Sequence, residues 1–171
     1  ACHPLIVTKI WTWSNKRQGT NCRPRYRGTD LEAIPSYAAR HAVGVQYQAR
    51  GDWASNGLDR YLAAKRMWDA GASLEGLKAD FYEKMFPSAA DEFAAYMALY
   101  DQRGQNRINT RKFLKDGLFF LDRMKARIRT DAERRRWRYY VLFLHQQVLE
   151  YGTELAVTPA EDLVLWTEMA R

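Results

Sequence analysis

The chain has 171 residues, of which 47% are hydrophobic and 27% are charged, and its formal net charge at pH 7 is +7. This length allows about one domain core, and no apolar run approaches the roughly 18 residues of a membrane-spanning helix. The composition therefore indicates a globular protein and excludes a membrane protein. The first residues lack the pattern of an export signal. Cys2 and Cys22 are too few for a disulfide scaffold, although a single disulfide bond between them is possible in an oxidising compartment.

The first predicted element is a strand over residues 5–13, where β-branched and aromatic residues follow one another without helical spacing. A basic loop over residues 14–28 follows. A capping-box pattern at Thr29 then predicts the start of a helix. Because of Pro35, the regular part of this helix is expected to start late. Residues 43–49 have the composition of a second strand. The order strand, loop, helix and strand predicts a βαβ unit with two parallel strands and a right-handed crossover.

From Ser55 onward the apolar residues recur with the period of an amphipathic helix, which predicts helices over the rest of the chain. Thr130 and Glu133 form a capping box, Gly152 has the position of a helix end, and Thr158 begins a last helix. The residues predicted to face the core are Leu58, Tyr61, Leu62, Lys65, Trp68, Leu74, Leu77, Phe81, Met85, Phe93, Tyr96, Met97, Tyr100, Phe113, Leu114, Leu118, Leu121, Met124, Trp137, Val141, Leu144, Val148 and Tyr151.

These elements predict a mainly α fold, in which a helical bundle is preceded by a short βαβ segment that resembles the last strands of a TIM-type barrel. Two parallel strands alone leave unpaired edges, and parallel sheets are normally covered on both faces. We therefore assign residues 1–54 to terminal β/α units of a barrel and residues 55–171 to a helical domain. The alternative, in which the two strands simply pair over the helical layer, stays open.

Aromatic, amide and charged residues gather where the two predicted strands end. In parallel α/β folds, ligands meet the loops beyond the carboxyl ends of the strands. An aromatic face beside polar groups suits a sugar ring, which is apolar on its C–H faces and polar at its rim. Some of the tryptophans could instead be core residues. The predicted substrate-binding residues are Trp11, Trp13, Asn15, Tyr47, Gln48, Arg50, Asp52 and Trp53.

The chain offers no complete catalytic apparatus. Glycoside hydrolysis generally needs two carboxylates about 5 to 10 Å apart. Only Asp52 is suitably placed, because Asp30 and Glu32 are better explained as residues of a helix start. The histidines and cysteines lack the spacing of a zinc site, and no nucleotide-binding or nucleophile-elbow motif occurs. We therefore predict no catalytic residue, no metal site and no cofactor in this chain.

The basic run at residues 134–138, next to Tyr139 and Tyr140, could contact phosphates and bases. On a helix these side chains spread over several faces, and Trp137 belongs to the apolar stripe. A solvated face is therefore the favoured interpretation, and nucleic acid is not the expected partner. A second hypothesis is nevertheless kept, in which the chain is a stand-alone helical interaction module whose basic face binds an acidic partner or nucleic acid.

Residues 58–99 (LDRYLAAKRMWDAGASLEGLKADFYEKMFPSAADEFAAYMAL) resemble the helical region that follows the barrel in a bacterial glycoside-hydrolase-like family, an uncharacterised domain family similar in layout to α-glucuronidases and β-N-acetylhexosaminidases. Residues 30–53 (DLEAIPSYAARHAVGVQYQARGDW) resemble the last barrel unit of the same proteins. The positions that carry the helical resemblance are Tyr61, Leu62, Ala64, Trp68, Asp69, Phe81, Tyr82, Ser88, Ala89 and Ala90.

The resemblance implies that the chain is the C-terminal portion of a barrel-type glycoside hydrolase. It would contribute substrate-binding loops and a buttressing helical domain, and its partners would be an oligosaccharide or glycan and the upstream barrel of the same protein. The family's catalytic carboxylates belong to earlier barrel strands, so none is carried over to this chain. The isolated chain is then expected to be inactive, and the parent protein to be periplasmic or secreted.

Overall fold

The computed structural model describes residues 7–11, 34–39, 44–48, 53–104 and 110–155. The chain forms two compact units, Ala1–Phe81 and Tyr82–Arg171. The described residues are mostly helical, which confirms the predicted mainly α class. The division at residue 54 that the sequence suggested stays a prediction. None of the described helices is long and apolar enough to cross a membrane.

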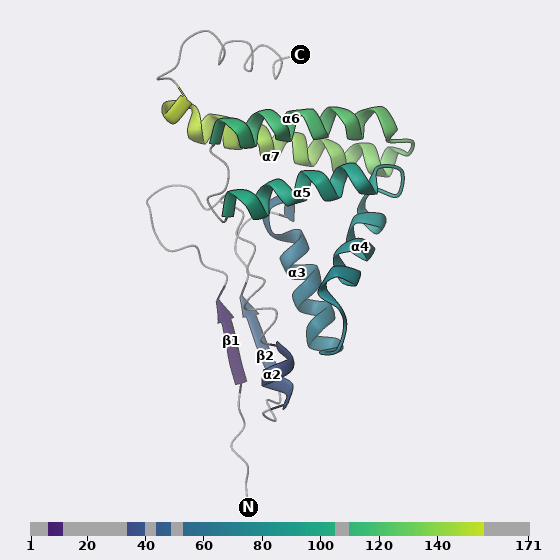
Figure 1. Cartoon of the computed structure of the whole chain (residues 1–171), viewed down its shortest axis with the longest axis vertical. Helices are drawn as coiled ribbons and strands as arrows, with labels where there is room; N and C mark the ends of the chain where they lie inside the picture. The colour runs from purple at the N-terminus through teal and green to yellow at the C-terminus, as the bar shows by residue number, and fades with distance from the viewer. Residues whose placement is uncertain (1–6, 12–33, 40–43, 49–52, 105–109, 156–171) are drawn as a thin grey trace, which may run out of the picture. The chain divides into compact units, whose positions relative to one another are not determined.

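The first unit contains a small parallel sheet. Strand β1 (Val7–Trp11) pairs with strand β2 (Gly44–Gln48) in parallel (Figure 1). In the register, Trp11 lies opposite Gln48. Between them in sequence lies helix α2 (Ile34–Ala39), which has Pro35 in its first turn, where a missing N–H leaves no helical hydrogen bond unmade. The parallel register brings the carboxyl ends of the two strands side by side. That these strands belong to a larger barrel stays a prediction.

The described part of the first unit also contains one helix and the first two thirds of the next, which continues into the second unit. Helix α3 (Trp53–Trp68) begins two residues before the predicted start, and helix α4 (Leu74–Met85) follows after a short turn. The Tyr61 hydroxyl on α3 donates a hydrogen bond to the Asp80 carboxylate on α4, and the ring of Tyr61 lies 5.3 Å from that of Phe81. A polar and an aromatic contact therefore join the two helices.

The turn between α3 and α4 is closed by side chains at both of its ends. The guanidinium of Arg66 donates to the carbonyl oxygen of Ala72. The Ser73 hydroxyl accepts a hydrogen bond from the Gly76 N–H at 3.3 Å, which makes Ser73 the N-cap of α4. The Ser73 bond satisfies one of the N–H groups that the start of α4 would otherwise leave without a partner, and the Arg66 bond fixes the turn just before it.

The buried face of α3 differs from the predicted stripe. Leu62 is buried as predicted, but Lys65 is exposed and the side chain of Trp68 is 93% exposed, so their assignment to the core was wrong. Asp59 and Arg66 are buried instead. At roughly 100° per residue, Trp68 lies about 160–180° around the helix from these two residues. The buried face is thus rotated toward charged residues, and Trp68 faces solvent.

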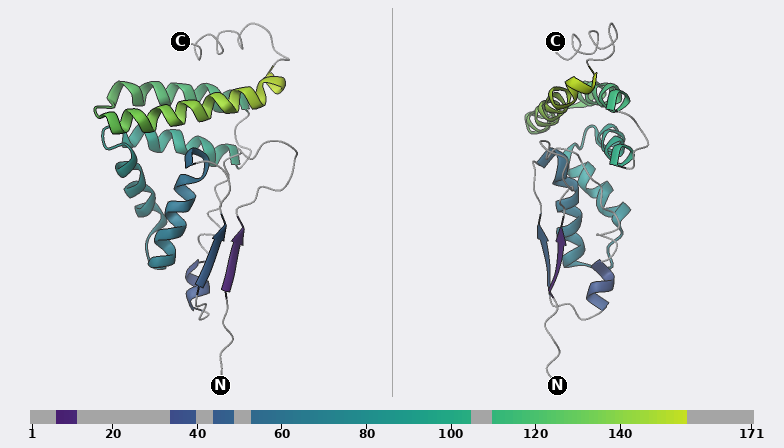
Figure 2. Two further views of the ribbon diagram at one scale, coloured as in Figure 1. Left: turned by 180° about the vertical axis from the view of Figure 1, so that it is seen from behind. Right: turned by 90° about the vertical axis from the view of Figure 1, so that its left-hand side faces the viewer.

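The second unit is built around helices α5 (Ala90–Gly104), α6 (Thr110–Arg127) and α7 (Asp131–Leu155). Helix α6 packs against both α5 and α7, and α6 and α7 run side by side in both views of Figure 2. Gly117 permits the close approach of α6 to α7, because a Cβ there would lie 3.2 Å from Cδ1 of Leu144.

Aromatic side chains fill the core of this unit. The rings of Phe86 and Phe93 lie 4.7 Å apart, and Phe93 meets Tyr140 of α7 at 5.0 Å with nearly perpendicular planes. The predicted core residues Phe93, Tyr96, Met97, Tyr100, Phe113, Leu114, Leu121, Met124 and Leu144 are buried, as is Phe81 of the first unit. Tyr61, Leu74, Leu77, Met85, Leu118, Trp137 and Val141 are half-buried.

The predicted end of the last described helix was wrong. Helix α7 continues through Gly152 to Leu155. A glycine inside a helix costs only about 1 kcal/mol relative to alanine, so helical neighbours can override it as a stop signal. The side chains of Val148 and Tyr151 and the helix predicted to begin at Thr158 lie outside the described residues.

Replacement of Trp68 by alanine is expected to change the free energy of unfolding by no more than about 0.5 kcal/mol, because the side chain is exposed. Leu62→Ala in the same helix should cost about 2–5 kcal/mol, because Leu62 is fully buried. Urea unfolding followed by circular dichroism measures both. Equal losses for the two variants would contradict the observed orientation of α3.

Candidate functional site

The predicted binding residues at the strand ends come from neighbouring strands. Trp11 is the register partner of Gln48, and Tyr47 is the partner of Ile10, one step further back. Trp11 and Gln48 are the last residues of β1 and β2, so both strands end at the same edge of the sheet. This is the position at which ligand-binding loops leave a parallel sheet. The predicted site residues Trp13, Asn15, Arg50 and Asp52 lie outside the described residues.

Trp53 is the predicted site residue whose side chain the structure describes. The sequence suggested that Trp53 belongs to a loop, but it is the first residue of α3. The residue is 41% exposed. Five residue steps separate it from Gln48, so the two Cα atoms are at most about 18 Å apart. The chain length therefore limits how far Trp53 can lie from the end of β2.

The Trp53 indole lies with one face on its own helix. A Cβ built on Gly57 would be 2.8 Å from Cε2 of the indole and 2.9 Å from Nε1. Cε2 is a fusion carbon bonded to three ring atoms within the plane, so an atom this close can approach it only from above or below the ring. One face of the indole thus covers Gly57, and Gly57 is buried.

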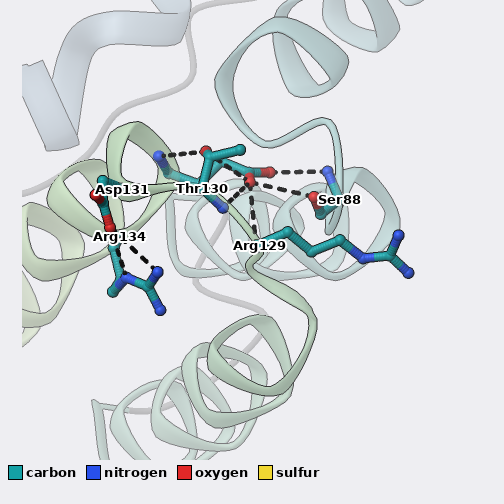
Figure 3. Close-up of polar contacts among 6 residues, drawn as sticks. Ser88, Arg129, Thr130, Asp131 and Arg134 are labelled. Atoms are coloured by element: carbon teal, nitrogen blue, oxygen red, sulfur yellow. Dashed lines mark hydrogen bonds and ion pairs between the residues drawn. The ribbon is translucent and has the colours of Figure 1, made fainter.

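The second unit contains a buried carboxylate with many hydrogen bonds. Glu133, in the first turn of α7, accepts bonds from the backbone N–H of Ser88 at 2.8 Å and of Thr130 at 3.1 Å (Figure 3). It also accepts bonds from the Ser88 and Thr130 hydroxyls and, at 3.4 Å, from the Arg129 N–H. In return, Thr130 Oγ1 accepts the Glu133 N–H at 3.1 Å. The predicted capping box is confirmed, and its glutamate also binds the turn before α5.

These hydrogen bonds determine the charge of Glu133. Burial of the carboxylate raises its pKa, but the bonds from the Ser88 backbone, from Thr130 and from the Ser88 hydroxyl outweigh this effect and lower the pKa from 4.5 to about 2. The carboxylate is therefore ionised at any ordinary pH, and its oxygens are occupied by protein donors. It suits a structural role and not proton transfer.

A second buried carboxylate, Glu92, lies in the first turn of α5 and binds two arginines of α6. Its Oε1 lies 2.9 Å from Nε of Arg127 and 3.5 Å from the guanidinium of Arg123, while Oε2 is buried without a hydrogen-bond partner among the described residues. These two ion pairs join α5 to α6. Because both arginines are about half exposed, the interaction is a link between helices and not a closed site.

The positive charge of the chain is concentrated in α6 and the first part of α7. Residues 110–138 contain 11 of the 27 basic residues and 4 of the 20 acidic residues, so this segment accounts for the whole net charge of +7. Arg134 pairs with Asp131 at 3.1 Å, whereas the exposed Arg135 and Arg138 have no ion-pair partner within the described ranges. Sequence reasoning identified this run but could not separate paired from unpaired arginines.

Among the residues that the structure describes, no three histidine, cysteine or acidic side chains are grouped as metal ligands. Comparisons with protein-family models, with curated proteins and with solved structures give no match to this chain. The sequence and the geometry above are therefore the basis for a functional proposal.

Substitution of Glu133 by glutamine is expected to lower the free energy of unfolding at pH 7 by about 2–3 kcal/mol, because it removes charged hydrogen bonds from a buried group. The folded-state pKa lies below the unfolded value, so the stabilisation is complete above pH 4.5 and is lost as the pH falls toward about 2. Urea unfolding between pH 2 and pH 7 measures the difference between the two proteins.

Glu75→Gln is the control, because Glu75 is exposed and pairs only with Lys78 at the helix surface. The Glu75→Gln substitution should lower the free energy of unfolding by about 0–1 kcal/mol. If the free energies of unfolding of wild type and Glu133→Gln differ by the same amount over this whole pH range, the role assigned to the carboxylate is contradicted.

Proposed function

We propose that this chain is the C-terminal portion of a barrel-type glycoside hydrolase. The ends of β1 and β2 and the beginning of α3 contact the carbohydrate, and the helices that follow buttress the barrel. The observation that carries the proposal is the parallel register, in which Trp11 and Gln48 end neighbouring strands at one edge, with the half-exposed Trp53 five residues further along.

The small sheet supports a larger barrel. In the described part of the chain the sheet consists of β1 and β2 alone. Two parallel strands have two outer edges with unpaired backbone groups, and strands of this kind normally belong to sheets that helices cover on both faces. Further βα units beside β1 would pair these groups and close the barrel.

The positions of the buried carboxylates support the proposal that catalysis takes place upstream of this chain. Glu92 and Glu133 are buried in the second unit, where arginines and backbone N–H groups bind them. Neither can serve as the acid or base of a glycosidase, which needs two carboxylates beside the scissile bond. In the proposal, the catalytic carboxylates therefore belong to barrel strands upstream of this chain, and the isolated chain hydrolyses no glycoside.

The test measures oligosaccharide binding and hydrolysis by a protein that includes the upstream barrel. Trp53→Ala should raise the Kd of the bound oligosaccharide about tenfold, which corresponds to ~1.4 kcal/mol, because it removes an aromatic contact with the sugar. Trp68→Ala is the matched control, since Trp68 is an exposed tryptophan at the other end of the same helix. Equal affinity of the parent and a folded Trp53→Ala variant would contradict the proposed site. So would hydrolysis by the isolated chain that Asp52→Asn abolishes.

A second candidate function is favoured by the unpaired arginines of α7. Arg135 and Arg138 are exposed, and residues 110–138 hold the whole net charge of the chain. Like charges three residues apart on a helix repel each other and do not stabilise it. In this candidate function the α7 surface binds an acidic partner or nucleic acid, as an interaction module.

If the module binds nucleic acid, the logarithm of the affinity should fall linearly with the logarithm of the salt concentration, with a slope of roughly −0.7 per phosphate contact on a single strand. Arg135→Ala with Arg138→Ala should reduce this slope by about 1 to 2 and leave stability nearly unchanged. Fluorescence anisotropy with a labelled single-stranded oligonucleotide measures the slope. Arg134→Ala, which removes an arginine paired with Asp131, is the control. Binding that is absent at low salt, or equally weakened by the control, excludes this candidate.

A further inference from the structure

One side of α7 combines unpaired arginines with exposed apolar side chains. Arg135 and Arg138 are exposed, and their side chains form no hydrogen bond or ion pair within the described ranges. Tyr139 is 43% exposed and Leu142 is 65% exposed. At roughly 100° per residue, these four side chains fall within about 100° of the helix circumference and within roughly 10 Å along the axis. We call these four residues the α7 outer face.

The opposite side of α7 packs in the core, so the α7 outer face is not needed for the packing of this unit. Tyr140 and Leu144 lie on that opposite side and are buried. A single exposed leucine is common on protein surfaces and needs no explanation. Leu142, however, lies one turn from an exposed tyrosine and one turn from an arginine without a counterion. Tyrosine and arginine are the residues in which protein interfaces are enriched.

The arginines of the α7 outer face lack the partners that the other arginines of this helix have. Helix α7 contains four arginines and no lysine. Arg134 pairs with Asp131, and Arg136 donates to a backbone carbonyl at 2.8 Å. The other two, Arg135 and Arg138, are left to pair with a group outside the described residues. A guanidinium binds a carboxylate or a phosphate with two parallel hydrogen bonds, so the complementary partner is acidic.

Leu142 distinguishes a protein partner from nucleic acid. A nucleic acid strand binds through its phosphates and through base faces that stack on aromatic rings, so it can use the arginines and Tyr139 but has no matching group for an aliphatic side chain. A helix of another protein can present a carboxylate and an apolar side chain one turn apart. Those two groups match Arg138 and Leu142, which are also one turn apart, so the composition of the face favours a protein.

We propose that the α7 outer face binds an acidic amphipathic helix of a partner protein, whose carboxylates pair with Arg135 and Arg138 and whose apolar side chains cover Tyr139 and Leu142. The spacing of the face describes this helix. A parallel partner has two acidic residues three positions apart and an apolar residue four positions further on, and an antiparallel partner has the reverse order. The inference rests on the second candidate function, whose partner it specifies, and is independent of the carbohydrate site.

The experiment uses the full 171-residue chain and two fluorescein-labelled probes. The first probe is a synthetic alanine-based helix of about 20 residues that repeats glutamate, glutamate and leucine at the spacing given above, made in both sequence directions. The second is a single-stranded oligothymidylate. Fluorescence anisotropy at low salt gives each Kd. The peptide should bind more tightly than the oligothymidylate, and replacement of its glutamates by glutamine, or of its leucines by alanine, should raise its Kd about tenfold.

Substitutions in the chain locate the peptide on the α7 outer face. Arg135→Ala with Arg138→Ala should raise the Kd of the peptide about tenfold, and Leu142→Ala about fivefold. Arg134→Ala, which removes an arginine paired with Asp131, and Leu142→Met, which keeps an apolar side chain of similar volume, are the matched controls. Both controls should bind the peptide like wild type. Because the substituted side chains are exposed, all variants should remain folded, which circular dichroism checks.

The other outcomes separate this inference from the second candidate function. If the oligothymidylate binds more tightly than the peptide, and Leu142→Ala binds it like wild type, the partner is nucleic acid, so the inference fails and the candidate function stands. Peptide binding that none of the outer-face substitutions weakens would overturn the proposed surface. Absence of peptide binding at low salt would overturn the proposed partner, and if the oligothymidylate does not bind either, the candidate function fails with it.

Discussion

The buried carboxylate of Glu133 is the constraint on which the second unit depends. An ionised carboxylate inside a protein is strongly unfavourable unless hydrogen bonds replace those to water. Here the replacing donors come from Thr130, at the start of α7, and from Ser88, in the turn before α5. The charge can be buried only when both segments are in place, so one side chain couples the α7 start to a turn 45 residues earlier.

The aromatic packing and the remaining polar contacts agree with this coupling. Phe86 lies between α4 and Ser88, and its ring packs on the rings of Phe93 and Tyr140, so the turn that Glu133 binds is next to the aromatic core. The indole N–H of Trp137 donates to the carbonyl oxygen of Leu121 at 2.8 Å and ties α7 to α6. The buried glutamates of this unit therefore have structural roles, and the carbohydrate site that we propose involves the strand ends of the other unit.

The sequence predicts those features that depend on neighbouring residues. Thr130 and Glu133 stand three positions apart, and this spacing alone indicates the capping box. The bond from Ser88 to Glu133 has no such signal, because it joins distant segments. Trp68 was misplaced because an apolar pattern cannot recognise a face that buries Asp59 and Arg66. The packing of the Trp53 ring on Gly57 depends on the position of the ring, which the sequence does not reveal.

The central claim is that β1 and β2 are the last strands of a catalytic barrel. The measurement that tests it most directly is the nucleotide sequence upstream of the Ala1 codon. The account predicts an open reading frame that encodes further βα units and a pair of carboxylates at strand ends. A start codon immediately before Ala1, preceded by noncoding sequence, would contradict it.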